Sequence, residues 1–307
     1  MKEDIKVPYL MYNAMFKSVF RKNPNVLKRL VELVLEENDI HLNLEDKTLT
    51  LKNNDLILNH YKDKQYICDF IINIDKYTDL SIEINRTFYP GLMERNMAYS
   101  FNIYYNHFKQ GNNYNEFEKY GLIQINFNKF SLSDDKIMNA FYLIDKDNPL
   151  NILSKNLLII HIDVYKCYKL VYNKTNLDEK SKMEKLVACL ASTSLSEISS
   201  ILGSDILEMK EKEKFLNDIA SSSQDEDVTK ALPFEESIDY RFELLEQDAL
   251  ERGIEQGIEQ GIKQGESKKQ QEMIKNLLKQ NVSLKTISIA AGISLEEVEK
   301  IAKSLKD

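Results

Sequence analysis

Two short stretches, YICDFIIN (residues 66–73) and LSIEIN (residues 80–85), decide the fold of this 307-residue chain. Both are short apolar runs, and turn-forming residues separate them, so they predict two antiparallel strands joined by a hairpin turn at residues 76–79. Successive side chains of a strand point to opposite faces. Asp69 and Glu83 are therefore expected to share one face of the pair, a few ångströms apart.

The pairing of Asp69 with Glu83 predicts a metal site. Two carboxylates set among apolar residues repel each other and lose hydration, unless a cation lies between them. Mg²⁺ accepts oxygen ligands in this arrangement and keeps several waters, one of which could attack a phosphodiester. Asn85 shares the face and could orient that water or donate a hydrogen bond to the phosphate. The alternative from pattern alone is the solvated side of a half-exposed sheet.

Helical periodicity is present on both sides of this hairpin. Apolar residues recur at helical spacing in residues 14–35, with Pro24 as the expected break between two helices. Residues 92–110 present a second broad apolar face, and Gly111 is expected to end that helix. The hairpin is therefore expected to lie between helices.

Two later apolar runs, LIQINF (122–127) and NLLIIHIDV (156–164), predict further, largely buried strands. The order helix, strands, helix, strand, strand indicates an α/β fold with a mixed sheet flanked by helices, over residues 1–175. Amphipathic helical sequence follows. We expect a helical region over residues 176–250 and a separate C-terminal region over residues 251–307.

The C-terminal region contains the repeat GIEQGIEQGIKQG, with glycine at every fourth position from Gly253 to Gly265. Each glycine costs a helix about 1 kcal/mol relative to alanine, which favours close packing against another helix; a solvated, weakly helical linker is the alternative. Residues 283–303 have helix-turn-helix spacing around Gly292. The second of these helices begins with acidic residues, which opposes DNA binding. We therefore favour packing or dimerisation, and expect a homo-oligomer formed through the C-terminal helices.

Composition limits the class of protein. The 41 Lys and Arg against 49 Asp and Glu argue against a strongly basic protein that coats nucleic acid. Residues 1–110 include 15 Lys and Arg and 15 Asp and Glu, so local basic patches there could still bind DNA. No apolar run is long enough to span a bilayer and the start lacks a signal-peptide core, so we expect a cytoplasmic protein with no membrane partner. The three cysteines are widely spaced and are expected to be buried and free.

Beyond composition, the spacing Asp69…Glu83-x-Asn85 resembles the D…(D/E)xK signature of PD-(D/E)XK nucleases. The chain resembles most closely their recombination-promoting nuclease (Rpn) group, a family of transposase-like nucleases whose third position is usually Gln. Further matching pieces follow in order: MFKSVF (15–20), ERNMAYSFNIYYNHFKQGNNY (94–114), YGLIQINF (120–127) and LIIHIDVYKCYKL (158–170). The resemblance covers most of the chain and implies a restriction-endonuclease-like sheet.

By position, the resemblance implies that Asp69 and Glu83 bind the metal, with the Ile84 carbonyl as a further ligand. It implies that Lys17 and Arg95 are cations near the site, for phosphate contact or for bracing the acidic pair. Lys17 could otherwise be a surface lysine, and Arg95 a structural ion-pair partner.

Two positions depart from the family pattern. Asn85 replaces Lys or Gln and is one methylene shorter than Gln. Asn13 stands where the first helix of the family commonly has Asp, and Glu32 and Glu36 are candidates to supply that carboxylate instead. Either departure could weaken activity.

The resemblance implies a metal-dependent DNA endonuclease, linked to recombination or mobile elements, that uses Mg²⁺ or another divalent cation such as Mn²⁺ or Ca²⁺. The alternative is a catalytically weakened homologue that binds DNA or a partner protein as an oligomer. A third possibility is an oligomerisation protein whose sheet is only a scaffold.

Overall fold

The computed structural model describes residues 4–42, 44, 50–51, 70–74, 77–106, 119–133, 135–172 and 180–303. The chain divides into two compact units, Met1–Phe242 and Glu243–Asp307. No helix among the described residues combines the length and the apolar character needed to cross a membrane.

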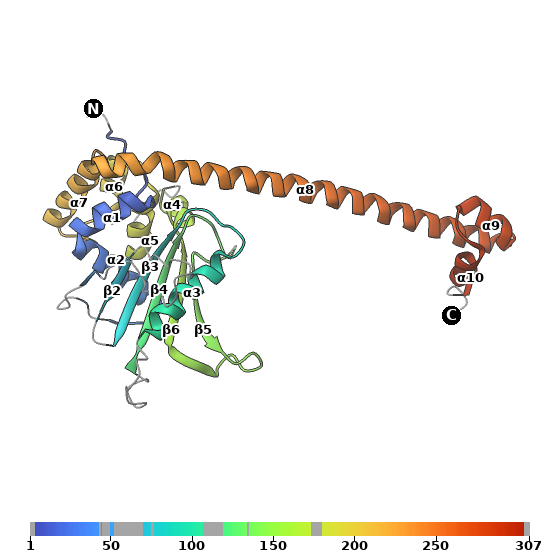
Figure 1. Cartoon of the computed structure of the whole chain (residues 1–307), viewed down its shortest axis with the longest axis horizontal. Helices are drawn as coiled ribbons and strands as arrows, with labels where there is room; N and C mark the ends of the chain where they lie inside the picture. Colours follow the sequence, from blue (N-terminus) through green and yellow to red (C-terminus); the bar gives the residue numbers. More distant parts are fainter. Residues whose placement is uncertain are drawn as a thin grey trace, which may run out of the picture. The chain divides into compact units, whose positions relative to one another are not determined.

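The first unit is built on a six-stranded mixed sheet with strand order β1-β2-β3-β4-β6-β5 (Figure 1). The strands are β1 (Thr50–Leu51), β2 (Phe70–Asn73), β3 (Thr78–Asn85), β4 (Gly121–Asn128), β5 (Met138–Ile144) and β6 (Ile152–Asp163). The three central strands, β3, β4 and β6, run parallel, while β1, β2 and β5 pair antiparallel with their neighbours. The predicted α/β fold with a mixed sheet is confirmed.

The β2–β3 hairpin forms with the expected pairing. Phe70 pairs with Ile82 and Asn73 pairs with Asp79. Strand β3 begins two residues earlier than expected, because the ladder continues to a hydrogen bond of 3.0 Å from the Ile74 amide to the Thr78 carbonyl. Asp79, which was expected in the turn, is therefore a strand residue.

The edge strand β5 was not predicted from the sequence. All of its residues are exposed or half-buried, and its pairing with β6 contains register shifts. The side chains of this edge strand are largely exposed to solvent, so its sequence needs no continuous apolar run. The apolar pattern that predicts the buried strands is therefore absent from β5.

The two N-terminal helices are α1 (Asn13–Lys22) and α2 (Pro24–Glu36), so the predicted break at Pro24 is confirmed. Pro24 is the first residue of α2. Its missing amide hydrogen costs no hydrogen bond there, because the first amides of a helix have no intrahelical acceptor. Helix α3 (Leu92–Tyr105) ends before the predicted position. Gly111, which was expected to end it, lies outside the described residues.

The main core lies between one face of the sheet and a group of helices (Figure 1). Leu80, Ile82 and Ile84 of β3 enter this core together with apolar residues of α1 and α2. Five later elements contribute residues to the same core: α4 (Val164–Tyr172), α5 (Lys182–Ala188), the 3₁₀ turn η3 (Cys189–Ala191), α6 (Leu195–Ile201) and α7 (Met209–Ser222). The helices after residue 175 therefore share the main core with the sheet. Cys167 and Cys189 are buried there as free thiols, and burial raises the pKa of both; Cys68 lies outside the described residues.

The opposite face of the sheet carries α3. Tyr99 and Ile103 of α3 pack on Ile71, Leu122 and Leu157 of three different strands. This second core is small, and polar residues occupy much of the remaining sheet surface beneath α3. That polar area contains the candidate active site.

The second unit consists of α8 (Glu226–Lys279) from Glu243 onward, with α9 (Leu284–Ala291) and α10 (Leu295–Lys303). Its own core is formed by Ile274, Ile287, Ala291 and Val298. Gly292 ends α9 in the left-handed conformation, with φ of 66°, which a glycine adopts without strain. The predicted pair of short helices around Gly292 is therefore present.

Candidate active site

The α3-facing side of β3 is polar and buried at once. Ser81, Glu83 and Asn85 alternate with the core residues of this strand, and their exposed fractions are 0%, 2% and 3%. Asn126 and Asn128 of β4 lie directly across from Glu83 and Asn85 in the parallel register. The strand faces predicted from the sequence are therefore confirmed for β3. The face is covered by α3 and not solvated, which removes the half-exposed-sheet alternative for these residues.

Hydrogen bonds connect the side chains on this face into a relay across the sheet. Arg95 of α3 donates from Nη2 to Asn85 Oδ1 at 3.0 Å, and Asn85 Nδ2 donates to Asn128 Oδ1 at 2.9 Å. Asn128 Nδ2 then lies 3.1 Å from Nδ1 of His161 on β6. Both polar atoms of Asn85 are therefore engaged, although its Nδ2 has a second hydrogen.

A second branch of the network starts at the same arginine. Asn96 Oδ1 accepts from Arg95 Nη2 at 3.1 Å, and Asn96 Nδ2 donates to Asn126 Oδ1 at 2.9 Å. Gln124 Nε2 donates to the Asn96 carbonyl at 3.1 Å. Buried polar groups that are satisfied in this way fix one arrangement of their side chains.

Two tyrosines hold the Arg95 guanidinium. Its carbon lies 5.6 Å from the ring centroid of Tyr89 and 5.3 Å from that of Tyr99, within the range of cation–π contacts. Burial raises the pKa of Tyr89, Arg95 acts to lower it, and the Glu83 carboxylate acts to raise it. Tyr89, Arg95 and Glu83 thus share one electrostatic environment.

The other side of the site is formed by the beginning of α8. Glu235 forms an ion pair with Arg86, and its two carboxylate oxygens accept the backbone amides of Asn13 and Ala14 at 2.8 and 3.0 Å. Asp239 lies 3.2 Å from Arg86 Nε. Burial raises the pKa of Asp239, while Arg86 acts to lower it. Glu235 therefore joins three segments, by capping α1 and holding Arg86 at the end of β3.

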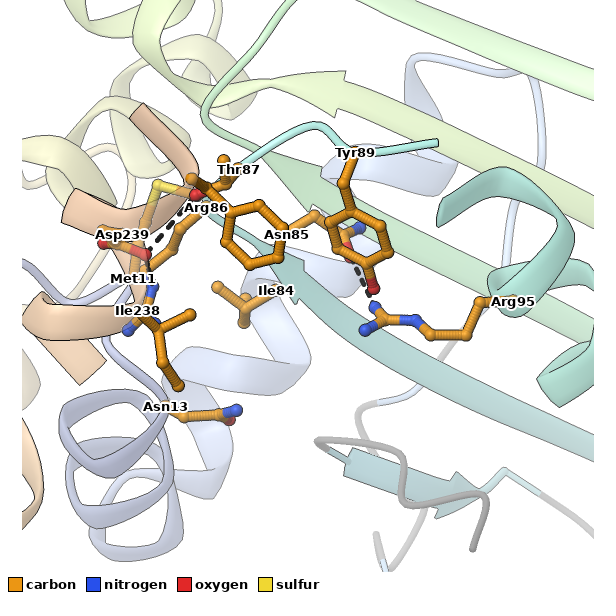
Figure 2. Close-up of a pocket in the computed structure, with 11 residues that line it drawn as sticks. Met11, Asn13, Ile84, Asn85, Arg86, Thr87, Tyr89, Arg95, Ile238 and Asp239 are labelled. Carbon is orange, nitrogen blue, oxygen red and sulfur yellow. Dashed lines mark hydrogen bonds and ion pairs between the residues drawn. The ribbon is translucent and has the colours of Figure 1, made fainter. Parts of the chain in front are cut away.

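A pocket of about 240 Å³ lies between these groups. Figure 2 shows Asn85 on its wall, with Arg95 on one side and Arg86 and Asp239 on the other. Asn13 also lines it. Phe242 of α8 lines the pocket as well and stacks on Tyr89, with ring centroids 5.2 Å apart. The pocket therefore joins α1, β3, α3 and α8.

The structure brings together several of the residues singled out from the sequence. Ile84, Asn85 and Arg95 line the pocket, and Glu83 is buried between Ile84 and Ile82 on the same strand. Lys17 lies on α1 one turn after Asn13 and is half-buried, but it does not line this pocket. Asp69 lies outside the described residues.

Glu32 and Glu36 do not replace the family's helix-one carboxylate at this pocket. Arg29 pairs with them at 3.5 and 3.4 Å, and all three line a different cavity. The sequence reasoning missed Arg86, Tyr89, Glu235 and Asp239. Arg86 and Tyr89 directly follow the IEIN strand end and could have been suspected from that position, whereas nothing in the local sequence connects α8 to this site.

The described donor atoms are compatible with a hard divalent cation. Asn13 Oδ1 is buried and forms no hydrogen bond within the described part of the chain, and its residue lines the pocket beside Ile84 and Asn85. A carboxamide oxygen, a Glu carboxylate and a backbone carbonyl are ligands of the kind that Mg²⁺ and Ca²⁺ accept. No cluster of three or more His, Cys, Asp or Glu side chains with metal-binding geometry occurs among the described residues.

Comparison with known proteins gives a family match. A protein-family model described as "PD-(D/E)XK nuclease family transposase" matches residues 11–229, which include every described element from α1 to α7. Neither the curated proteins nor the solved structures gave a match.

Proposed function

Because this chain belongs to the PD-(D/E)XK nuclease family transposase family, we propose that it is a metal-dependent DNA endonuclease linked to recombination or mobile elements. Asp69 and Glu83 would hold the divalent ion, Mg²⁺ in the first instance, together with the Ile84 carbonyl. The observation that carries the proposal is the convergence of Asn13, Ile84, Asn85 and Arg95 in one pocket at the carboxyl end of β3, beside the buried Glu83.

Such an ion, when bound, would activate a water molecule and screen the negative charge of the phosphate. The protein's own groups have distinct tasks around it. Arg95 is an obligate donor fixed by two tyrosines, so it suits contact with a phosphate oxygen. Asn85 has one Nδ2 hydrogen beyond the one it gives to Asn128, and this hydrogen could serve the attacking water or the phosphate. Lys17, one turn from Asn13, would add positive charge along the bound strand.

Asp69 is the partner expected for Glu83. It directly precedes Phe70, and Phe70 pairs with Ile82, the neighbour of Glu83. This register is the support for assigning the two carboxylates to one ion.

A plasmid-nicking assay with the full chain tests the proposal in Mg²⁺, Mn²⁺ and Ca²⁺. Asp69→Asn and Glu83→Gln keep the side-chain shape and remove the charge, so each should lower the nicking rate at least about 100-fold, the upper end for losing a supporting group in a metal site. Glu213→Ala, at an exposed position of α7, is the control and should leave the rate unchanged. Equal nicking by all four proteins would reject the assigned site.

The second candidate function is a weakened homologue that binds DNA or a partner without cutting. One observation favours it: both polar atoms of Asn85 are held by Arg95 and Asn128, which restricts their use by substrate. DNA retardation by the wild-type protein with no nicking in any of the three cations would support this candidate over the endonuclease.

A further inference from the structure

A second cavity, of about 470 Å³, lies on the α3 side of the sheet. Most of its apolar lining comes from three elements: Met93, Met97 and Phe101 of α3, Phe141 and Leu143 of β5, and Ile159 of β6. Its volume is within the range of small-molecule sites, about 300–1,000 Å³. Phe101 and Phe141 are about half exposed, at 47% and 50%, so the cavity is open to solvent on that side.

Two buried polar side chains also line this cavity, Asn96 and His161, with exposed fractions of 1% and 5%. Both belong to the hydrogen-bond network of the candidate active site. Arg95 lines the active-site pocket, and its neighbour Asn96, which accepts from it at 3.1 Å, lines the second cavity. The two sites are therefore joined through consecutive residues of α3.

The network determines which nitrogen of His161 carries the proton. A guanidinium can only donate, so Asn85 must accept from Arg95 through Oδ1 and donate through Nδ2. Asn128 then accepts through Oδ1 and donates through Nδ2 to Nδ1 of His161. A neutral imidazole that accepts at Nδ1 must carry its hydrogen on Nε2.

Burial lowers the pKa of His161 to about 4, so the ring is neutral near pH 7. Its Nε2–H forms no hydrogen bond within the described part of the chain. The edge-on contact of Phe141, with ring centroids 5.8 Å apart, places this ring against the apolar wall. The cavity thus combines flat apolar sides with one neutral hydrogen-bond donor.

We infer that this cavity receives an unstacked nucleobase of the DNA, an inference that rests on the proposed function and names how its substrate is held. A base offers an apolar face for contact with phenylalanine and methionine side chains, and its edge carries acceptor atoms for a single N–H donor. An aliphatic segment would cover the Nε2–H donor of His161 without offering it an acceptor, which is unfavourable.

The distance across the sheet suits one nucleotide held at both sites. Asn85, Asn128 and His161 lie on three adjacent strands, so the relay spans two interstrand spacings, about 10 Å. A nucleotide with its phosphate at Arg95 could therefore place its base between α3 and β5. Enzymes that act on nucleic acid gain selectivity by holding a base outside its stack in this manner.

Fluorescence anisotropy of the full chain in EDTA, where no cutting occurs, tests the cavity. The probes are a short fluorescein-labelled single-stranded thymidine oligonucleotide and a strand of equal length made of abasic units. The wild type should prefer the thymidine strand, and Phe141→Ala should reduce that preference at least about fivefold, since a stacked base contributes about 1–3 kcal/mol. Leu153→Ala, at an 81% exposed position of β6 outside the cavity, is the matched control and should keep the preference.

Equal affinity of the wild type for both strands would overturn the inference. An equal effect of Phe141→Ala on the affinity for both strands would also overturn it. If Phe141→Ala changed the oligomer mass without changing the base preference, the apolar walls would be assigned to a protein interface. Glu83→Gln separates this inference from the proposed function. If Glu83→Gln keeps the base preference and nicking does not depend on Glu83, only the endonuclease site is contradicted. If nicking depends on Glu83 but the protein shows no base preference, only the nucleobase cavity is contradicted.

Discussion

At the scale of single residues, Arg95 sets the hydrogen-bond directions within the site. Because its guanidinium only donates, it orients Asn85, then Asn128, and finally selects the tautomer of His161. Removing the polar group of any one of these side chains would leave a buried donor or acceptor unsatisfied. Each unsatisfied group would lower the free energy of unfolding by about 1–3 kcal/mol. The polar face of β3 is therefore a structural network as well as a candidate catalytic surface.

The buried His161 predicts a pH dependence of stability. Its folded pKa is about 4, below the ordinary value of 6.5. Above pH 6.5 the folded and unfolded chains both hold the neutral ring. Between pH 6.5 and about 4 only the unfolded chain binds the proton, so the free energy of unfolding should fall by about 1.4 kcal/mol per pH unit from this group.

Urea denaturation of the wild type and His161→Gln at pH 7, 6 and 5 measures this contribution. Gln can accept from Asn128 but does not titrate, so the stability difference between the two proteins should shrink as pH falls. A constant difference across this range would show that His161 takes up its proton equally in both states.

At the scale of elements, the start of α8 is part of the candidate site. Glu235 caps α1 through two backbone amides and pairs with Arg86, while Asp239 provides Arg86 with a second carboxylate. These contacts connect the N-terminal helix, the end of β3 and α8 around one pocket. The family match ends at residue 229, so these acidic residues of α8 lie beyond it.

Glu235→Ala should destabilise the protein by about 1–3 kcal/mol, because α1 loses its cap while Asp239 still neutralises Arg86. Thermal and urea unfolding of the full chain measure the loss. Glu236→Ala removes the same charge from the next, exposed position and should change stability by less than about 0.5 kcal/mol. Equal destabilisation by both substitutions would indicate that only helix charge matters, and not the cap.

At the scale of the whole molecule, the glycine repeat lies in α8 within the second unit. A Cβ atom added at Gly253, Gly257, Gly261 or Gly265 would meet nothing within 4 Å in this chain. The interleaved Ile254, Ile258 and Ile262 are between 53% and 58% exposed. We propose that a second copy of the chain covers this stripe, because close approach of another helix offsets the cost of four glycines.

Sedimentation velocity of Gly257→Ala/Gly261→Ala tests this assembly. In a single chain the two methyl groups meet open space and would stabilise the helix by about 1 kcal/mol each. Against a partner helix they would prevent close approach, so the oligomer mass should fall. Gln256→Ala/Gln260→Ala, on the same exposed helix, is the control. An unchanged mass with increased helicity in the glycine variant would identify the segment as a solvated linker.

The sequence by itself determined the elements whose signals are local. Alternation fixed which face of β3 carries Glu83 and Asn85, Pro24 fixed the boundary between α1 and α2, and Gly292 marked the turn between α9 and α10. Side-chain period and backbone conformational limits act over a few residues, so a single sequence displays them. The ordered motifs likewise indicated the family that the match to residues 11–229 confirms. The assignment of Asp69, Glu83 and Lys17 stays a prediction.

Only the tertiary structure decided what surrounds those residues. The edge strand β5 is recognised only by its pairing with β6. The contribution of Glu235 and Asp239 to the site, and the entry of the helices after residue 175 into the main core, depend on contacts between segments distant in the chain. The hydrogen-bond relay from Arg95 to His161 is of the same kind. An amide side chain has no fixed role until its neighbours are known, because it can donate and accept equally well, and those neighbours come together only when β3, β4, β6 and α3 are assembled.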